Sequence, residues 1–259
     1  MSSSTFYIGL SGLDSFSKAI SVTSDNVANS ATTGFKSNTV LFGDMVSNYY
    51  ANGTTTGDKM GAGTTVLGTL KDFTQGSIDN TSTWTNVALN GDGFFAVKLA
   101  GDTTTYYTRD GNFSLDADGY LVNAEGYQVL GNDGSAIQVD TSLYSDLYVD
   151  TTGQIYGTNG DGDVVTVGNP LLLSKFSNQN GMIRQGSNLY EAGGEVGTVT
   201  TNASGTIDVT VKGSALELSN VDLSTEMVNL IIYQADYNAN AKSISTANDT
   251  LNNVINLVR

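Results

Sequence analysis

The chain has 259 residues, 39% of them hydrophobic, and its 26 acidic and 11 basic residues give a net charge of −15 at pH 7. That charge repels phosphate backbones and anionic lipid surfaces, so we expect neither nucleic acid nor membrane insertion among its partners. The absence of Cys and His removes disulfides, thiolate and imidazole metal sites, and the commonest general base. We therefore expect that the chain is not an enzyme and binds no cofactor.

The first thirty residues carry an apolar heptad repeat, which predicts an amphipathic helix. Its members recur every seven positions, with one more midway in the first heptad: Phe6, Leu10, Leu13, Ile20 and Val27. Ser17 and Ser24 occupy companion positions where a strong coiled coil would carry aliphatic residues, so this helix needs a partner. Met1 to Leu10 contains no basic segment followed by an apolar run, and we therefore expect no cleaved signal peptide.

The middle of the chain combines Gly-rich connections with short alternating runs. Residues 47–63 are rich in Asn, Gly and Thr, which predicts a flexible connection. Four runs beyond it predict short strands: 93–98, 107–109, 112–115 and 120–122. Pairs such as Asp118-Gly119 between these runs favour the tight turns of antiparallel hairpins.

The clearest repeat lies near the other end and predicts a helix of roughly 35 residues from Asp222 to Arg259. Its seam positions are Leu223, Met227, Leu230, Tyr237, Ala241, Ile244, Leu251 and Ile255. Asp222 is placed to cap the helix N-terminus, and Glu226 suits the first turn. Because two incomplete seams bury best against each other, we expect the terminal helices to pair.

Together these patterns predict an α+β fold, with the terminal helices paired as a coiled-coil-like unit beside a central, mainly antiparallel β-rich domain. The predicted division assigns residues 1–46 and 214–259 to the helical unit, 47–63 to the connection, and 64–213 to the β-rich domain.

No set of residues makes a convincing catalytic, cofactor-binding or metal site. Ser15 to Lys18 followed by Ser24-Asp25-Asn26 is superficially similar to elements of penicillin-recognising acyltransferases, but the two elements lie too close together. Residues 159–163 offer oxygen ligands to Ca²⁺ yet lack the Gly and Glu positions of an EF-hand loop, so we interpret them as a turn. A carboxylate-pair glycosidase needs no His, but the sequence nominates no pair.

Motifs at both ends of the chain resemble the flagellar hook and rod protein family. One follows the first helix and the other precedes the second, and the segments 87–95, 107–113 and 186–190 resemble β-domain landmarks of the same family. The residues that carry the terminal motifs are Asn26, Ala28, Asn29, Gly34, Phe35, Lys36, Ser219, Asn220 and Val221.

This resemblance implies a structural subunit of the bacterial flagellum, located in the hook or basal body. Members of the family leave through the type III export apparatus without cleavage and polymerise helically beneath an assembly cap, between adjoining axial proteins. The paired helices would line the inner wall of a hollow tube, and the β-rich domain would form its outer wall. Polymerisation of the chain with itself is therefore the implied function.

Within this family the sequence favours the hook, a tube that transmits torque from motor to filament. The Phe42-Gly-Asp-Met45 segment and the Asn256-Leu-Val-Arg259 ending resemble hook proteins. The alternative is a drive-shaft subunit of the distal rod, because the length suits both and leaves no room for the outer domains of long hook proteins. A secreted β-domain adhesin is a remoter alternative, since it has no reason to carry matched terminal helices.

Overall fold

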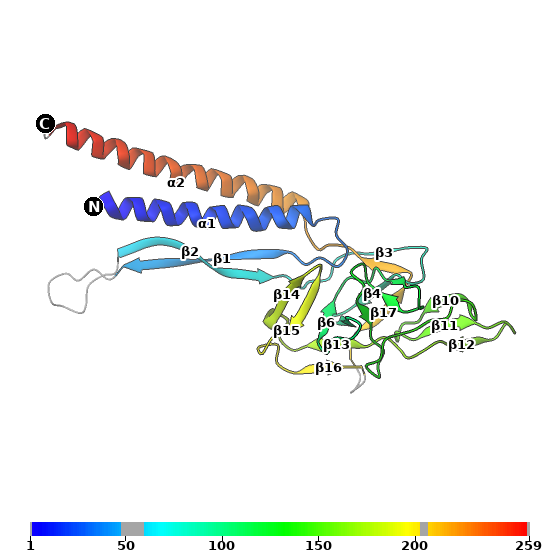
Figure 1. Cartoon of the computed structure of the whole chain (residues 1–259). Helices are drawn as coiled ribbons and strands as arrows, with labels where there is room; N and C mark the ends of the chain where they lie inside the picture. The colour runs from blue at the N-terminus through cyan, green and yellow to red at the C-terminus, as the bar shows by residue number, and fades with distance from the viewer. Residues whose placement is uncertain (1, 48–59, 203–206, 258–259) are drawn as a thin grey trace. The chain divides into compact units, whose positions relative to one another are not determined.

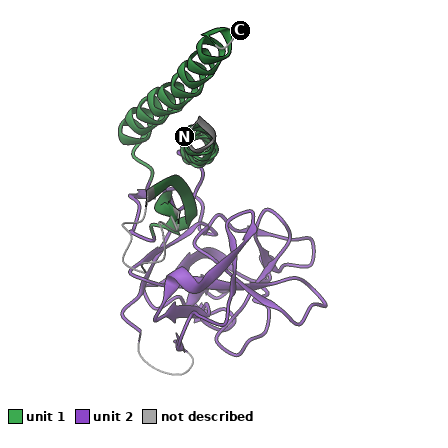
Figure 2. Cartoon of the chain, turned by 90° about the vertical axis from the view of Figure 1, so that its left-hand side faces the viewer, with its two compact units in different colours: residues 1–29, 38–72, 221–259 green, residues 30–37, 73–220 purple. Residues whose placement is uncertain are grey.

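The computed structural model describes residues 2–47, 60–202 and 207–257, and the chain divides into two compact units (Figure 2). Unit 1 comprises Met1–Asn29, Asn38–Asp72 and Val221–Arg259. Unit 2 comprises Ser30–Ser37 and Phe73–Asn220. The chain therefore passes between the units four times, and the short segment Ser30–Ser37 belongs to unit 2 although both of its neighbours belong to unit 1.

Two helices form most of unit 1. The helices α1 (Ser2–Ala28) and α2 (Leu223–Leu257) run antiparallel and side by side (Figure 1). The Asp222 carboxylate caps α2, because it accepts hydrogen bonds from the Ser224 amide at 3.0 Å and the Thr225 hydroxyl at 2.6 Å. The predicted terminal helices, their pairing and the Asp222 cap are confirmed.

A long antiparallel hairpin completes unit 1. Its strands, β1 (Asn38–Ser47) and β2 (Met60–Lys71), pair with each other and lie along α1 (Figure 1). Register shifts occur at Leu41/Phe42 and at Met45/Val46. Such bulges bend a strand and increase its twist, which suits a two-stranded ribbon lying along a helix.

The hairpin differs from the predicted division of the chain. Residues 60–63, expected in a flexible connection, lie in β2, and residues 64–71, expected in the β-rich domain, belong to unit 1. The expected connection at 48–59 lies outside the described residues. The hairpin lacks a regular polar-apolar alternation, because it is a two-stranded ribbon along α1 and not part of a β core. The sequence pattern therefore did not predict it.

Unit 2 is built from short strands that pair antiparallel throughout its described residues. These are β3 (Ile78–Asn80), β4 (Val87–Asn90), β5 (Phe94–Lys98), β6 (Thr105–Thr108), β7 (Ser114–Leu115), β8 (Leu121–Val122), β9 (Gln128–Val129), β10 (Ser145–Val149), β11 (Ile155–Thr158), β12 (Val164–Thr166), β13 (Leu173–Phe176), β14 (Met182–Gly186), β15 (Leu189–Ala192), β16 (Val199–Thr201), β17 (Thr210–Gly213) and β18 (Ala215–Glu217), with a 3₁₀ turn at Gln179–Gly181. The predicted strand runs correspond to β5, β6, β7 and β8, which confirms the β-rich middle.

The largest sheet among the described residues has the strand order β14-β15-β6-β5-β9-β8-β7, and β13 pairs with both β5 and β16. Smaller sheets join β10-β11-β12, β4 with β17, and β3 with β18. The β3–β18 pair lies close in sequence to two passages between the units. Strand β3 follows the passage from unit 1 into unit 2 at residue 73, and β18 precedes the passage back into unit 1 after residue 220.

Strand β5 separates the two hydrophobic cores of unit 2. Side chains alternate along a strand, so Phe94 enters one core while Phe95 and Val97 enter the other. The Phe94 ring centroid lies 5.6 to 6.0 Å from those of Phe176, Phe73 and Tyr190, in edge-to-face arrangements. Both faces of β5 are thus buried, and unit 2 holds its own core.

Candidate assembly surface

Helix α1 contacts α2 and the hairpin through small and polar side chains. Its buried residues, within the part whose side chains are described, recur every three or four positions: Gly9, Gly12, Ser15, Ala19, Thr23 and Asn26. A Cβ at Gly9 would lie 2.6 Å from Cγ1 of Ile244, and a Cβ at Gly12 would meet the Asn240 amide. The two glycines therefore permit a close approach of the helices that larger residues would prevent.

The apolar seam predicted for α1 lies at the margin of this contact. Phe6, Leu13, Ile20 and Val27 are half-buried, and Leu10 is exposed. The buried stripe of small residues was missed, although its spacing of three and four positions was visible in the sequence.

The predicted seam of α2 divides into half-buried and exposed members. Leu230, Ile244 and Leu251 are half-buried, whereas Leu223, Met227, Tyr237, Ala241 and Ile255 are exposed. The prediction paired each heptad position with a companion four residues later. The structure instead half-buries residues three positions later, namely Tyr233, Asn240 and Ala247. At one of these positions the Asn240 side chain lies against Gly12 of α1, and at another the Tyr233 ring packs against Phe16 of α1.

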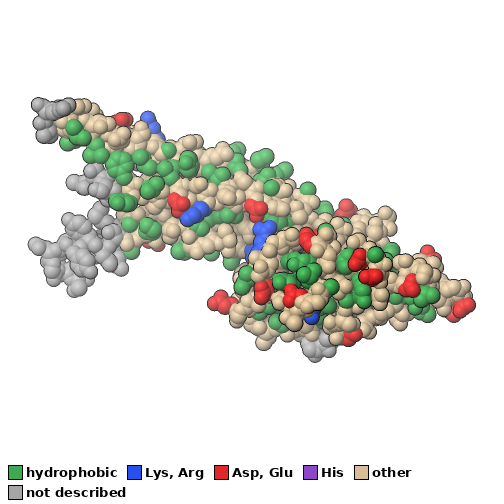
Figure 3. All heavy atoms as spheres, viewed as in Figure 1, with side chains coloured by type: hydrophobic (Ala, Val, Ile, Leu, Met, Phe, Trp, Pro, Cys, Tyr) green, Lys and Arg blue, Asp and Glu red, His purple; other side chains and the backbone are tan. Residues whose placement is uncertain are grey.

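Many apolar side chains of unit 1 consequently remain exposed in the described chain. On α2 they include Leu223, Met227, Val228, Ile231 and Ile232, and on the hairpin Leu41, Val46, Leu67 and Leu70. Ile231 alone is 64% exposed, and no residue of α2 is fully buried. Figure 3 shows hydrophobic side chains gathered over the helices. We refer to these nine residues as the exposed apolar surface.

Two groups of contacts fix the three layers of unit 1 to one another. Phe16 of α1, Phe42 of β1 and Tyr233 of α2 form a triangle with ring centroids 5.6 to 6.3 Å apart. The buried Asn26 side chain exchanges two hydrogen bonds with the Asn38 backbone, at 2.8 and 2.9 Å, and donates to Glu226 at 2.9 Å. Partial burial raises the pKa of Glu226, although the Asn26 hydrogen bond opposes that shift.

The structure divides the nine residues of the terminal motifs between the units. Asn26, Ala28 and Asn29 end α1, where the Asn29 amide bonds back to the Asp25 carbonyl, and Val221 begins the last segment of unit 1. In unit 2, the segment that holds Gly34, Phe35 and Lys36 is joined by backbone bonds to the segment that holds Ser219 and Asn220. Gly34 N–H donates to the Glu217 carbonyl at 2.9 Å, and Asn220 N–H to the Phe35 carbonyl at 3.4 Å. Gly34 has φ of 65°, which explains glycine there.

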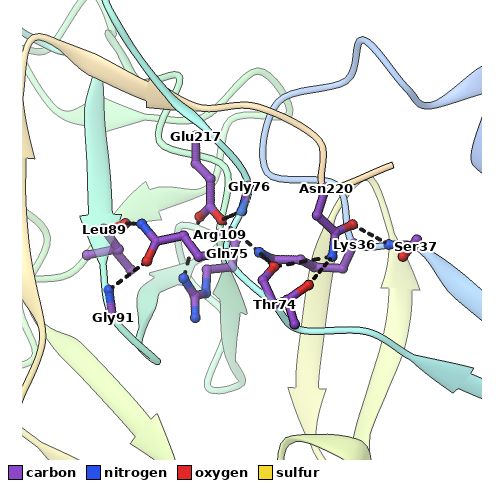
Figure 4. Close-up of polar contacts among 10 residues, drawn as sticks. All are labelled: Lys36, Ser37, Thr74, Gln75, Gly76, Leu89, Gly91, Arg109, Glu217 and Asn220. Carbon is purple, nitrogen blue, oxygen red and sulfur yellow. Dashed lines mark hydrogen bonds and ion pairs between the residues drawn. The ribbon is translucent and has the colours of Figure 1, made fainter. Parts of the chain in front are cut away.

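A buried charge cluster lies beside this meeting point (Figure 4). Lys36, Arg109 and Glu217 have fully buried side chains; Lys36 Nζ lies 2.7 Å from Glu217 Oε1, and Arg109 Nη1 lies 3.4 Å from Oε2. The Arg109 guanidinium also lies over the Phe94 ring, 5.0 Å from its centroid. Burial lowers the pKa of Arg109, and the neighbouring carboxylate of Glu217 opposes that shift.

Glu217 and Arg109 were not singled out from the sequence. Glu217 shares its face of β18 with the buried Ala215, so strand alternation placed a carboxylate among buried positions. The alternation could have indicated that Glu217 is buried, but it could not identify the cations that pair with Glu217. These lie 181 and 108 residues away along the chain.

Among the described residues no group of His, Cys, Asp or Glu is arranged to hold a metal ion. None of the helices in that part of the chain is long and apolar enough to cross a membrane. Trp84, the only tryptophan of the sequence, packs against the larger core of unit 2.

Three family models match the chain. The model described as "Flagella basal body rod protein" matches residues 6–36, the "Flagellar hook protein FlgE/F/G D1 domain" matches 88–157, and the "Flagellar basal body rod FlgEFG protein C-terminal" matches 212–257. Together they cover most of α1, about the first half of the long segment of unit 2, and all of α2.

Curated relatives extend this similarity over the whole chain. The chain is 34% identical to the flagellar basal-body rod protein FlgG of Bacillus subtilis, across 98% of this chain and 99% of that protein. It is 32% identical to FlgG of Agrobacterium fabrum, across 93% and 94%. It is 24% identical to the flagellar hook protein FlgE of Escherichia coli, across 97% and 99%, in an alignment of 409 positions.

Proposed function

The chain belongs to the flagellar hook and basal-body rod protein family, and from that premise we propose that it is a non-catalytic subunit of the distal rod, assembling with copies of itself into a tube. The observation that carries this proposal is the contrast between the exposed apolar surface of unit 1 and the buried cores of unit 2. Exposed apolar residues of this kind suit contact with other protein surfaces.

The similarity to curated relatives favours the rod over the hook. Sequence motifs alone favoured the hook, with the distal rod as the alternative, and the alternative is the better supported. The rod relative from Bacillus subtilis aligns across nearly its whole length over 266 positions. The alignment with the Escherichia coli hook protein needs 409 positions, so that protein carries long segments that this chain lacks. A chain without those segments suits a drive shaft.

Burial of the exposed apolar surface supplies the driving force for assembly. Fully burying a Val, Leu or Ile side chain contributes about 1.5–3 kcal/mol. Several such residues per subunit offset the cost of association, and the gain is repeated at every copy of a helical polymer. The nine residues themselves carry no charge, so burying them desolvates no ion of their own.

Other partners follow from the same proposal. A rod subunit contacts the axial proteins at each end of its own segment, the assembly cap and the export apparatus.

Electron microscopy of the purified chain, dilute and after concentration, tests the proposal. Straight tubes at high concentration are the expected result, whereas curved tubes would favour the hook. A chain that stays monomeric at all concentrations and fails to restore motility to a strain lacking its own rod subunit would contradict both.

A matched pair of variants links the tubes to the proposed surface. Ile231→Asp places a carboxylate on the exposed apolar surface and should prevent assembly without unfolding the monomer, because Ile231 is already solvated there. Asn238→Asp adds the same charge at an exposed polar position of α2 and should assemble normally. Equal assembly by both variants would remove the surface from the proposal.

A further inference from the structure

All four passages between the units begin or end in three segments of unit 2: residues 30–37, 73–77 and 217–220. These segments are far apart in the sequence, yet each is hydrogen-bonded to the others within unit 2. The adjoining β3–β18 pair continues the contact between the second and third segments. The places where the chain enters and leaves unit 2 therefore lie next to one another.

Glu217 bonds to each of the other two segments. Its backbone carbonyl accepts from the Gly34 amide at 2.9 Å, and its Oε1 accepts from the Gly76 amide at 2.9 Å and pairs with Lys36. Its Oε2 pairs with Arg109, which follows β6 in the largest sheet. One carboxylate thus connects both other segments to the core of unit 2.

Asn220 repeats this connection three residues later (Figure 4). Its Oδ1 accepts from the Ser37 amide at 2.8 Å, and its Nδ2 donates to the carbonyl and hydroxyl oxygens of Thr74, at 3.2 and 3.1 Å. Lys36 Nζ donates to the same Thr74 carbonyl at 2.7 Å. The backbone leaves no spare room, since a Cβ at Gly76 would collide with the Leu218 carbonyl oxygen.

The charges of the cluster are unequal, and this distinguishes its members. Two cations share one carboxylate, and all three side chains are fully buried. Removing Glu217 leaves two buried like charges, whereas removing Lys36 leaves a balanced Arg109–Glu217 pair. A buried charge that loses its partner is strongly destabilising. Loss of the carboxylate should therefore have the larger consequence.

We propose that Glu217 and Asn220 form a clamp that holds the three segments together, so that the chain enters and leaves unit 2 through one hydrogen-bonded knot. The clamp follows from these contacts alone. Its use, carrying load from the helices into the β core across several bonded strands at once, rests on the proposed function.

Hydrogen exchange of the full-length dilute chain tests the clamp. Five amides report on it directly: Gly34, Ser37, Gly76, Leu218 and Asn220. In Glu217→Gln, exchange in all three segments should accelerate by at least about tenfold, because two buried cations lose the carboxylate that they share, while amides of β5 change far less. In Lys36→Met, the acceleration should concentrate in residues 30–37. Glu195→Gln, at an exposed carboxylate of unit 2, should change none of these segments.

Acceleration that spreads evenly over β5 and the rest of the core would overturn the clamp and leave an ordinary buried ion cluster. Unchanged exchange in the three segments would overturn it too. Should Glu217→Gln fail to fold, Lys36→Met and Asn220→Ala still decide the matter, since the clamp predicts local opening in both. If Lys36→Met still assembles into tubes while exchange in its segments is accelerated, the clamp is supported and the proposed polymerisation does not depend on it.

Discussion

Phe94 and Ile231 are both large apolar side chains, yet Phe94 is 0% exposed in unit 2 and Ile231 is 64% exposed in unit 1. This contrast extends to the units as wholes. Among the buried hydrophobic residues of the described chain, Ala19 and Val40 belong to unit 1 and all the others to unit 2. Unit 2 thus holds nearly all of the fully buried apolar residues, whereas unit 1 leaves many of its apolar residues in contact with solvent.

The difference teaches which unit depends on neighbours. A domain is stable alone when burial of apolar area exceeds the entropy lost on ordering the chain. Unit 2 meets that condition with two cores and extensive antiparallel pairing. Unit 1 is two helices and a ribbon with few buried residues, so we expect its stability to come largely from copies packed against it.

Loss of assembly is the largest effect that the comparison predicts. Leu230→Asp puts a carboxylate at a half-buried seam position of α2, where an unpaired charge costs several kcal/mol in every subunit. We expect no tubes by sedimentation and electron microscopy, with thermal unfolding of unit 2 unchanged. Asn238→Asp, at an exposed position one residue beyond Tyr237, should be far milder. Tubes formed by Leu230→Asp at the level of that control would show that α2 does not build the wall.

Amide exchange in a proven monomer compares the two units directly. Amides of β5 should be protected at least about a thousandfold more than those of α1 and α2, because opening the helices exposes little buried area. Mass spectrometry of dilute chain, followed by the same measurement on assembled tubes, would show the helices gaining protection. Strong protection of both helices in the monomer would break the comparison, because unit 1 would then be stable alone.

Truncation of one large side chain in each unit gives the next effect. Phe94→Ala should cost unit 2 about 3–5 kcal/mol of unfolding free energy, since the ring fills the centre of its core. Met227→Ala removes an exposed side chain and should change the monomer by less than about 0.5 kcal/mol. The fluorescence of Trp84, the only tryptophan, reports urea unfolding of unit 2 in both variants. Similar losses in the two would contradict the contrast.

The sequence was most informative where a period matched an element. The heptads identified both helices, and Asp222 marked the start of α2 because a cap is a local interaction. Strands around Phe94 and Leu121 were predicted because alternation and Gly turns are local as well.

The remainder depended on contacts that no local pattern contains. The hairpin β1–β2 was not predicted because it packs on α1, which no local pattern reveals. The companion positions of the α2 seam were predicted one residue too far along the chain, because Asn240, and not Ala241, packs against the small residues of α1. Glu217 was missed because its partners are distant in sequence, so its burial could not be inferred without the fold.

A smaller effect comes from the pH dependence of unit 2. Burial raises the pKa of Tyr190 to about 12, from an ordinary value of about 10. Between those values the unfolded chain loses the phenolic proton while the folded chain keeps it. The unfolding free energy should therefore fall by about 1.4 kcal/mol per pH unit as pH rises through this window. Below pH 10 this group has no influence.

Tyr190→Phe isolates that contribution from those of other tyrosines. The variant should lose less stability than the original chain between about pH 10 and 12, when each is compared with its own value at pH 9 in urea unfolding. Identical slopes would mean that Tyr190 ionises as easily in the folded chain as in the unfolded one. Its ring would then be solvated, and the core around Phe94 less closed than unit 2 requires.

The smallest expected effect is that of calcium on the stability of unit 2, and it tests whether the apolar cores alone stabilise that unit. One hollow of about 300 Å³ is lined by three carboxylates, those of Asp116, Asp118 and Asp140. A cation bound there would stabilise unit 2 only if these carboxylates were available as ligands. Asp140 already accepts hydrogen bonds from the amide and hydroxyl of Ser142, which lower the pKa of its carboxyl and hold it in its own turn.

Because this carboxylate is already engaged, we expect the unfolding temperature in chelator and in millimolar calcium to agree within about 1 °C, well below the shift of about 2–4 °C that 1 kcal/mol produces in a chain of this size. Asp140→Asn provides the control, since it removes one potential ligand and should leave the comparison between chelator and calcium unchanged. A rise of several degrees that saturates with calcium, and disappears in Asp140→Asn, would show that a bound cation helps to stabilise unit 2. The contrast between the units would then rest partly on metal binding, and the Asp-rich turns would be ligands as well as turns.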